Sequence, residues 1–134
     1  MDRNTKFPIR VLIVDRHEAV RRALGIRLDA TNRLAVVGIS DNLSSACDKI
    51  DRSRPDVIIL GLHSSSGDEL ANIVQSIRTL PDGSGVVIVL APYVDALQRD
   101  LFMAAGAKRY LLKHINSQKL IQEIEAVAAK PASV

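Results

Sequence analysis

The fold of this chain is decided by residues 54–62, Arg54-Pro55-Asp56-Val57-Ile58-Ile59-Leu60-Gly61-Leu62. Four consecutive apolar residues, three of them β-branched, follow Pro55 and Asp56 and end at Gly61. Such a run predicts a short strand that is buried on both faces, as in the middle of a parallel sheet. In open α/β sheets, ligands bind just beyond the carboxyl ends of the strands. Gly61 occupies that place without a side chain, so the function of the chain depends on this position.

The composition fits one compact domain with one core, because the chain has 134 residues and 47% of them are hydrophobic. The formal net charge is +3, the 18 Lys and Arg residues are scattered, and aromatic residues make up only 3%. A direct role in nucleic-acid binding is therefore poorly supported. The single cysteine fits a reducing cytoplasm, and no apolar run approaches the roughly 20 residues of a membrane span.

Segments with strand character alternate with segments of helical periodicity. The predicted strands cover residues 9–14, 34–39, 57–60, 86–90 and 110–112, and the second is expected at an edge because it is less apolar. The predicted helices cover 18–30, a segment that starts at Asp41 or Asn42, a segment that starts near Asp68, 95–105 with Gly106 as the C-terminal cap, and a segment that starts at Asn116 or Ser117. This alternation predicts a doubly wound α/β fold with one parallel sheet covered on both faces. Periodicity alone does not fix the strand order.

Four motifs carry more information than a general α/β pattern. They are residues 13–18 (Ile-Val-Asp-Arg-His-Glu), 54–61, 89–91 (Val-Leu-Ala) and 105–113 (Ala-Gly-Ala-Lys-Arg-Tyr-Leu-Leu-Lys). In this register the chain resembles the receiver domain of bacterial response regulators. It is most similar to the branch that carries a LuxR/NarL-type helix-turn-helix after the receiver. The resemblance covers residues 9–129 and implies a CheY-like fold with a five-stranded parallel sheet in the order 2-1-3-4-5.

Receivers of this family phosphorylate themselves on an aspartate that ends the third strand. Two acidic residues at the end of the first strand help to bind Mg²⁺, a Ser or Thr ends the fourth strand, and a Lys ends the fifth. In this sequence the resemblance places Asp15 and Lys113 at matching positions. Arg16 stands in place of the second acid, Gly61 in place of the phosphoacceptor, and Ala91 in place of the hydroxyl residue.

These departures predict that phosphoryl chemistry is lost. An aspartyl phosphate requires a carboxylate nucleophile, which Gly61 does not have. Mg²⁺ requires carboxylate oxygens, so Asp15 alone is a weak anchor. An inward-pointing Arg16 would repel a cation, by about 4 kcal/mol per unit charge at roughly 4 Å and an effective dielectric constant of about 20. We therefore expect an atypical, phosphorylation-independent receiver with no cofactor, weak or absent Mg²⁺ binding and no catalysis of its own.

The residues of this degenerate phospho-site pocket allow several arrangements. Asp15, Arg16 and Lys113 either form a closed triad, or Arg16 points to solvent and only Asp15 and Lys113 meet. A further alternative is that Arg16 and Lys113 hold a small anionic ligand. Tyr110 matches the switch aromatic that, in the family, turns inward on activation. It is either turned inward, which would fix the receiver in one state, or exposed on an inert face.

Other polar residues gather near the same edge of the predicted sheet. His17, His63 and His114 each follow a strand, and with Asp15 they raise the hypothesis of a transition-metal site, although their spacing matches no known metal motif. Residues 64–66 are three serines that form either a kinase target or a flexible turn.

The single cysteine, Cys47, falls on the apolar stripe of the second predicted helix with Leu43, Ala46 and Ile50. Residues at this spacing share one helix face, so Cys47 is predicted to pack in the core.

We predict a receiver domain from a DNA-binding transcription regulator of two-component type, acting through protein partners; the alternative is a stand-alone receiver adaptor. The predicted boundaries are a polar tail over 1–8, the receiver over 9–129, and the start of a linker or C-terminal tail over 130–134. A homodimer is expected through the last helices and strand five. DNA would be bound only by an output domain beyond this chain, and a cytoplasmic location without membrane contact is expected.

Two rival functions remain. In one, a displaced residue such as Asp68 is the phosphoacceptor. In the other, the doubly wound fold binds a nucleotide or flavin, but neither a Gly-x-Gly-x-x-Gly turn nor a P-loop follows any predicted strand.

Overall fold

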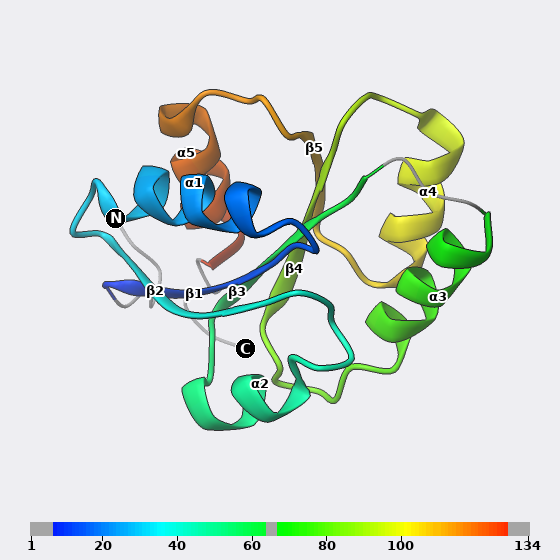
Figure 1. Ribbon diagram of the computed structural model, residues 1–134, viewed down its shortest axis with the longest axis horizontal. Coiled ribbons are helices and arrows are strands. Elements are labelled where there is room, and N and C mark those ends of the chain that lie inside the picture. Colours follow the sequence, from blue (N-terminus) through cyan, green and yellow to red (C-terminus); the bar gives the residue numbers. More distant parts are fainter. Residues whose placement is uncertain (1–6, 64–66, 129–134) are drawn as a thin grey trace.

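A computed structural model describes residues 7–63 and 67–128 of the protein (Figure 1). The elements alternate along the chain as β1 (Ile9–Val14), α1 (Glu18–Asp29), β2 (Leu34–Ser40), α2 (Cys47–Ser53), β3 (Val57–Gly61), α3 (Gly67–Arg78), β4 (Val86–Ala91), α4 (Ala96–Ala105), β5 (Arg109–Leu112) and α5 (Ser117–Ala128). The five strands form one parallel sheet in the order β2-β1-β3-β4-β5. The doubly wound fold, the strand order and the edge position of β2 are thereby confirmed.

Alternating side chains of the central strands build a separate core on each face of the sheet. Leu12, Ile58 and Val89 pack with residues of α2, α3 and α4 on one face. Ile13 and Ile59 pack with residues of α1 and α5 on the other. Figure 1 shows the same division, with α1 and α5 together on one side of the sheet and α2, α3 and α4 on the opposite side. Because both faces are covered, polar chemistry is confined to the strand ends.

Helix α2 differs from its prediction. It begins at Cys47 rather than near Asn42, because the Asn42 side chain accepts a hydrogen bond from the Ser45 backbone N–H at 2.8 Å and closes a turn there. Leu43, which lies in this turn, is buried, whereas Cys47 is exposed. The predicted core position of Cys47 is therefore wrong, although the other three residues of that stripe, Leu43, Ala46 and Ile50, are buried. Before Cys47 the backbone closes a turn through an i→i+3 bond from the Ala46 N–H to the Leu43 carbonyl at 3.2 Å, rather than continuing a helix.

The ends of the other helices agree with the sequence pattern. Gly106 caps α4 with a φ of 125°, a conformation that favours glycine. The side chain of Asn116 accepts a hydrogen bond from the Lys119 N–H at 2.8 Å and caps α5. Within residues 7–63 and 67–128, no helix has both the length and the apolar character needed to cross a bilayer. Residues 1–6 of the tail predicted over 1–8, the segment 130–134 and the three serines at 64–66 lie outside the described residues.

Candidate functional site

The site is built at the carboxyl ends of β1 and β3, which are neighbours in the sheet. Val14 pairs with Leu60 in the parallel register, so the residues that follow them, Asp15 and Gly61, lie side by side. Asp15 is only 2% exposed. A Cβ atom added to Gly61 would overlap Oδ2 of Asp15 and lie 3.0 Å from its Cγ. The Asp15 carboxylate therefore occupies the space that a side chain at position 61 would need.

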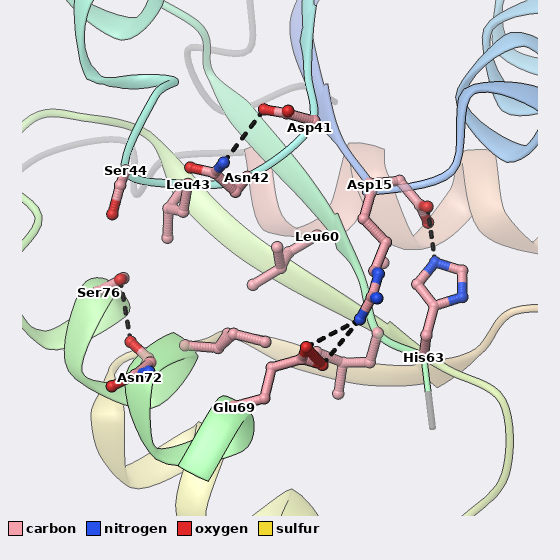
Figure 2. Close-up of a pocket in the computed structure, with 14 residues that line it drawn as sticks. Asp15, Asp41, Asn42, Leu43, Ser44, Leu60, His63, Glu69, Asn72 and Ser76 are labelled. Carbon is pink, nitrogen blue, oxygen red and sulfur yellow. Dashed lines mark hydrogen bonds and ion pairs between the residues drawn. The ribbon is translucent and has the colours of Figure 1, made fainter. Parts of the chain in front are cut away.

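Lys113 and His63 complete a closed triad with Asp15. Lys113 follows β5, and its Nζ lies 3.2 Å from Oδ2 of Asp15. The Nε2 atom of His63 lies 2.7 Å from Oδ1 of Asp15 (Figure 2) and 2.9 Å from Nζ of Lys113. One carboxylate thus faces one ammonium group and one imidazole in a site that is largely shielded from solvent.

Arg16 is not the third member of this triad. Its Nη1 donates to both carboxylate oxygens of Glu69 on α3, at 3.0 and 2.8 Å, as Figure 2 shows around Glu69. The Arg16 side chain is 54% exposed. Of the two arrangements that the sequence left open, the structure has the one in which Asp15 and Lys113 meet without Arg16, because Glu69 draws the guanidinium outward.

The contribution of His63 was missed in the sequence, although a signal for it was present. The Leu62 N–H donates to the Leu90 carbonyl at 2.8 Å, so the extended backbone continues past β3. In extended backbone, side chains two residues apart point the same way. His63 therefore points to the side on which a residue at position 61 would place its side chain, and it fills the pocket from there.

The remaining pocket position, Ala91, ends β4 and is fully buried. Its carbonyl accepts the Lys113 backbone N–H at 2.8 Å. This bond anchors the backbone from which Lys113 reaches Asp15, but the Ala91 methyl group offers no hydrogen bond to a ligand.

Tyr110 on β5 is half-buried and fastened to α4. Its hydroxyl donates to Oε1 of Gln98 at 2.6 Å, and its ring centroid lies 6.3 Å from that of Phe102. Burial, and then the negative charge of Asp95, raise the pKa of Tyr110 above its usual value of 10.0. The side chain is thus neither free in solvent nor at the Asp15 triad.

A cavity of about 320 Å³ opens beside the triad, between the loop after β2 and helix α3. Its wall carries the carboxylates of Asp15, Asp41 and Glu69 (Figure 2). Among its described lining residues there is no lysine and one arginine, Arg16. Because Arg16 is already paired with Glu69 and Lys113 with Asp15, neither cation is available to hold an anion. The lining therefore disfavours the small anionic ligand that the sequence allowed.

The residues present do not fit Mg²⁺. Among the described residues that directly follow β1, β3 and β5, Asp15 is the one acidic side chain, and the Lys113 ammonium and His63 imidazole already contact it. Mg²⁺ prefers several oxygen ligands in a strict octahedron, and one carboxylate supplies too few of them.

The comparisons with known proteins decide the family. The family of response regulator receiver domains matches residues 11–125. The chain belongs to the response regulator receiver family. The family match therefore favours a receiver over the alternative of a nucleotide- or flavin-binding domain.

Two curated relatives of this receiver are transcription regulators. It is 30% identical over 122 residues to the DNA-binding transcriptional activator DevR/DosR of Mycobacterium tuberculosis, covering 90% of this chain and 55% of that protein. It is 32% identical over 120 residues to the transcriptional regulatory protein LiaR of Bacillus subtilis, covering 90% of this chain and 56% of that protein. The chain thus spans about half the length of the curated relatives it matches.

Solved structures agree with the receiver fold. A LuxR-family two-component response regulator from Aurantimonas superimposes with a TM-score of 0.74 at 22% identity, covering 89% of this chain and 84% of that one. A LuxR-family DNA-binding response regulator from Staphylococcus aureus gives a TM-score of 0.73 at 18% identity, covering 90% and 98%. At these identities the likeness establishes the fold alone.

Proposed function

We propose that this receiver works without phosphorylation, as a protein-interaction module of a DNA-binding transcription regulator of two-component type. The observation that carries the proposal is the closure of the pocket around Asp15. The position that should hold the phosphoacceptor is Gly61, and the Asp15 carboxylate fills the space beside it. At position 61 a phosphoryl group has no nucleophile to accept it, and the two described cations of the pocket, Arg16 and Lys113, are already paired with carboxylates.

Charge balance supports a pocket that is complete without a ligand. In a phosphorylated receiver, the lysine that ends strand five would face an added anion. Here Lys113 faces Asp15 at 3.2 Å, and its ammonium also contacts His63. The chain supplies the counter-charge from its own sequence, so we expect a single resting conformation that does not depend on a kinase.

The proposal extends to the whole protein through the curated relatives. Both are described as transcription regulators, and DevR/DosR as DNA-binding. DNA contact would come from an output domain joined to this receiver, and the receiver itself would have no catalytic activity. The stand-alone adaptor remains the alternative, and the length of the natural protein distinguishes the two.

A homodimer is part of the proposal. Apolar side chains of Tyr93, Val94, Leu97 and Leu101, which we name the α4 surface, are exposed at and just before α4. Leu97 and Leu101 stand four residues apart on the same helix face. Apolar side chains gathered on one face are typical of an interaction site, and a second copy of the receiver is the occupant we propose.

The test of phosphorylation independence is an amide NMR titration, first with Mg²⁺ and then with Mg²⁺ plus beryllofluoride, which mimics an aspartyl phosphate. We expect no saturable shift at Asp15, Gly61, Ala91 or Lys113. The same titration tests the displaced acceptor, because shifts confined to the start of α3 would assign it to the exposed Asp68. Saturable shifts in either place at physiological Mg²⁺ would overturn the proposal.

A further inference from the structure

Two of the three histidines meet beside Asp15. His17 follows β1, His63 follows β3, and their ring centroids lie 4.0 Å apart with an interplanar angle of 79°. Nδ1 of His17 lies 3.0 Å from the nitrogens of the His63 ring. Nε2 of His63 in turn lies 2.7 Å from Oδ1 of Asp15, the pair drawn in Figure 2. His114 is exposed and does not join this group among the described residues.

The three side chains can direct one ligand atom each toward a common point. One imidazole nitrogen from each histidine and one Asp15 oxygen all lie within 4.8 Å of one another. Ligand atoms around a tetrahedral ion with bonds of about 2.0–2.1 Å are separated by somewhat more than 3 Å. The atoms are therefore already close to the spacing that coordination requires, and small rotations of the rings would replace the present hydrogen bonds.

The donor set selects the class of ion. Two imidazole nitrogens and one carboxylate oxygen suit Zn²⁺, Ni²⁺, Cu²⁺ and Co²⁺, whereas Mg²⁺ and Ca²⁺ prefer oxygen ligands alone. Such a set is distinct from the oxygen-based Mg²⁺ site of phosphorylated receivers, in which neither histidine would take part.

The three proposed ligands differ in their exposure to solvent, so the site is closed on one side and open on the other. Asp15 is buried, His63 is partly buried and His17 is exposed. The backbone N–H of His17 donates to Oδ1 of Asp15 at 2.9 Å and fixes the carboxylate. Oδ2 of Asp15 is buried and accepts no hydrogen bond within the described residues, although the Lys113 ammonium lies 3.2 Å away. Coordination through Oδ1 would leave Oδ2 facing Lys113, which would orient the carboxylate from outside the coordination shell.

We propose that Asp15, His17 and His63 bind one divalent transition-metal ion of the Zn²⁺ class. The ion would link the segment that enters α1 to the segment that follows β3, and solvent or a partner side chain would take its remaining position on the exposed side of His17. This inference does not rest on phosphorylation independence, since it concerns a different ion and two histidine ligands; Asp15 is common to the two sites.

The test is isothermal titration of the metal-free full chain with Zn²⁺, with Co²⁺ absorption as a readout of coordination geometry. We expect one Zn²⁺ per chain and a tetrahedral or five-coordinate Co²⁺ spectrum. His17→Ala and His63→Ala should each weaken Zn²⁺ binding at least tenfold, and His114→Ala should bind as the unchanged protein does. Because His17 is exposed and its backbone N–H is retained, His17→Ala remains informative even if His63→Ala does not fold.

A second readout, thermal unfolding in the presence of Zn²⁺, does not depend on the heat of binding. At the same Zn²⁺ concentration, the thermal midpoint should rise equally in the unchanged protein and in His114→Ala, and by less in His17→Ala, because a ligand that binds only the folded state stabilises it by an amount that rises with its affinity. Failure of the unchanged protein to bind Zn²⁺, or equal losses in His17→Ala and His114→Ala, would overturn the proposal. Either failure would leave the beryllofluoride result unaffected, so the two proposals fail separately.

Discussion

Gly61 and Asp15 share one volume: the carboxylate of Asp15 occupies the place in which any side chain at position 61 would begin. The carboxylate is held there by the His17 N–H, His63 and Lys113. The absence of a side chain at position 61 and the inward position of Asp15 are therefore one structural feature, and changes at either residue must be read together.

Gly61→Ala should destabilise the protein by about 1–3 kcal/mol, as is typical when a methyl group is forced into a packed site. Combining it with Asp15→Ala should remove most of this additional cost, because the overlapping carboxylate is gone. Urea unfolding of the two single variants and the double variant measures the coupling. Additive effects would show that the two residues do not compete for the same space.

Gly25→Ala is the matched control for this substitution. Gly25 lies inside α1, and a Cβ there would meet nothing within 4 Å. Alanine should therefore stabilise the helix by about 0.5–1 kcal/mol. Opposite signs for the two Gly→Ala changes would locate the effect in the pocket rather than in the loss of glycine.

Lys113→Met should cost more than Arg16→Met, although both remove one member of an ion pair. Losing Lys113 leaves buried Asp15 with His63 as its one side-chain partner among the described residues, and we expect a loss of roughly 2 kcal/mol, below the roughly 3–5 kcal/mol of a fully buried pair. The Arg16–Glu69 pair is largely exposed, so its loss should cost less than about 1 kcal/mol. Equal losses in denaturant unfolding would contradict the closed triad.

Tyr110 should ionise above pH 10.0, because burial and Asp95 disfavour its phenolate. Since the folded pKa lies above the unfolded one, the associated stability is fully present below pH about 10 and is lost as the pH rises through the folded pKa. Absorbance at the phenolate band in a Tyr93→Phe variant isolates Tyr110, because the chain has 2 tyrosines. Asp95→Asn should lower the midpoint, and a midpoint at or below pH 10 in the Tyr93→Phe protein would contradict the burial described here.

Leu97→Glu should weaken self-association if the α4 surface joins two copies. Leu97 is 73% exposed, and Ile26 on α1 is similarly exposed at 68%, so Ile26→Glu controls for adding a charge at an apolar surface position. Sedimentation velocity over a concentration series should show a dimer that weakens at least tenfold in Leu97→Glu alone. A monomer at all concentrations, or equal weakening in both variants, would reject this surface.

The sequence was a good guide to the elements and a partial guide to the site. Apolar runs such as residues 57–60 predicted the strands, because burial on both faces leaves a signal that does not depend on distant residues. The strand order came from the family resemblance, since periodicity carries no information on which strands pair. Helix α2 was misplaced because the Asn42 side chain accepts a hydrogen bond from the Ser45 backbone N–H and closes a turn, so the helix starts later.

The side chains of the site were harder to predict than the strands. The meeting of Asp15 and Lys113 follows from strand ends that share one edge. The outward turn of Arg16 depended on Glu69, 53 residues later in the chain. Likewise, His17 and His63 meet whereas His114 does not, because loop orientation rather than sequence position decides which histidines converge.

The exposed thiol of Cys47 has a practical consequence. Cys47 is the single cysteine of the sequence. In an oxidising solution two molecules can therefore form one intermolecular disulfide bond, but no molecule can form an intramolecular one. Such a bridged species would have the mass of a homodimer but would disappear on reduction and would not respond to dilution. Every measurement of self-association therefore needs a reductant, and the same thiol gives fluorophores or spin labels one native attachment point at the start of α2.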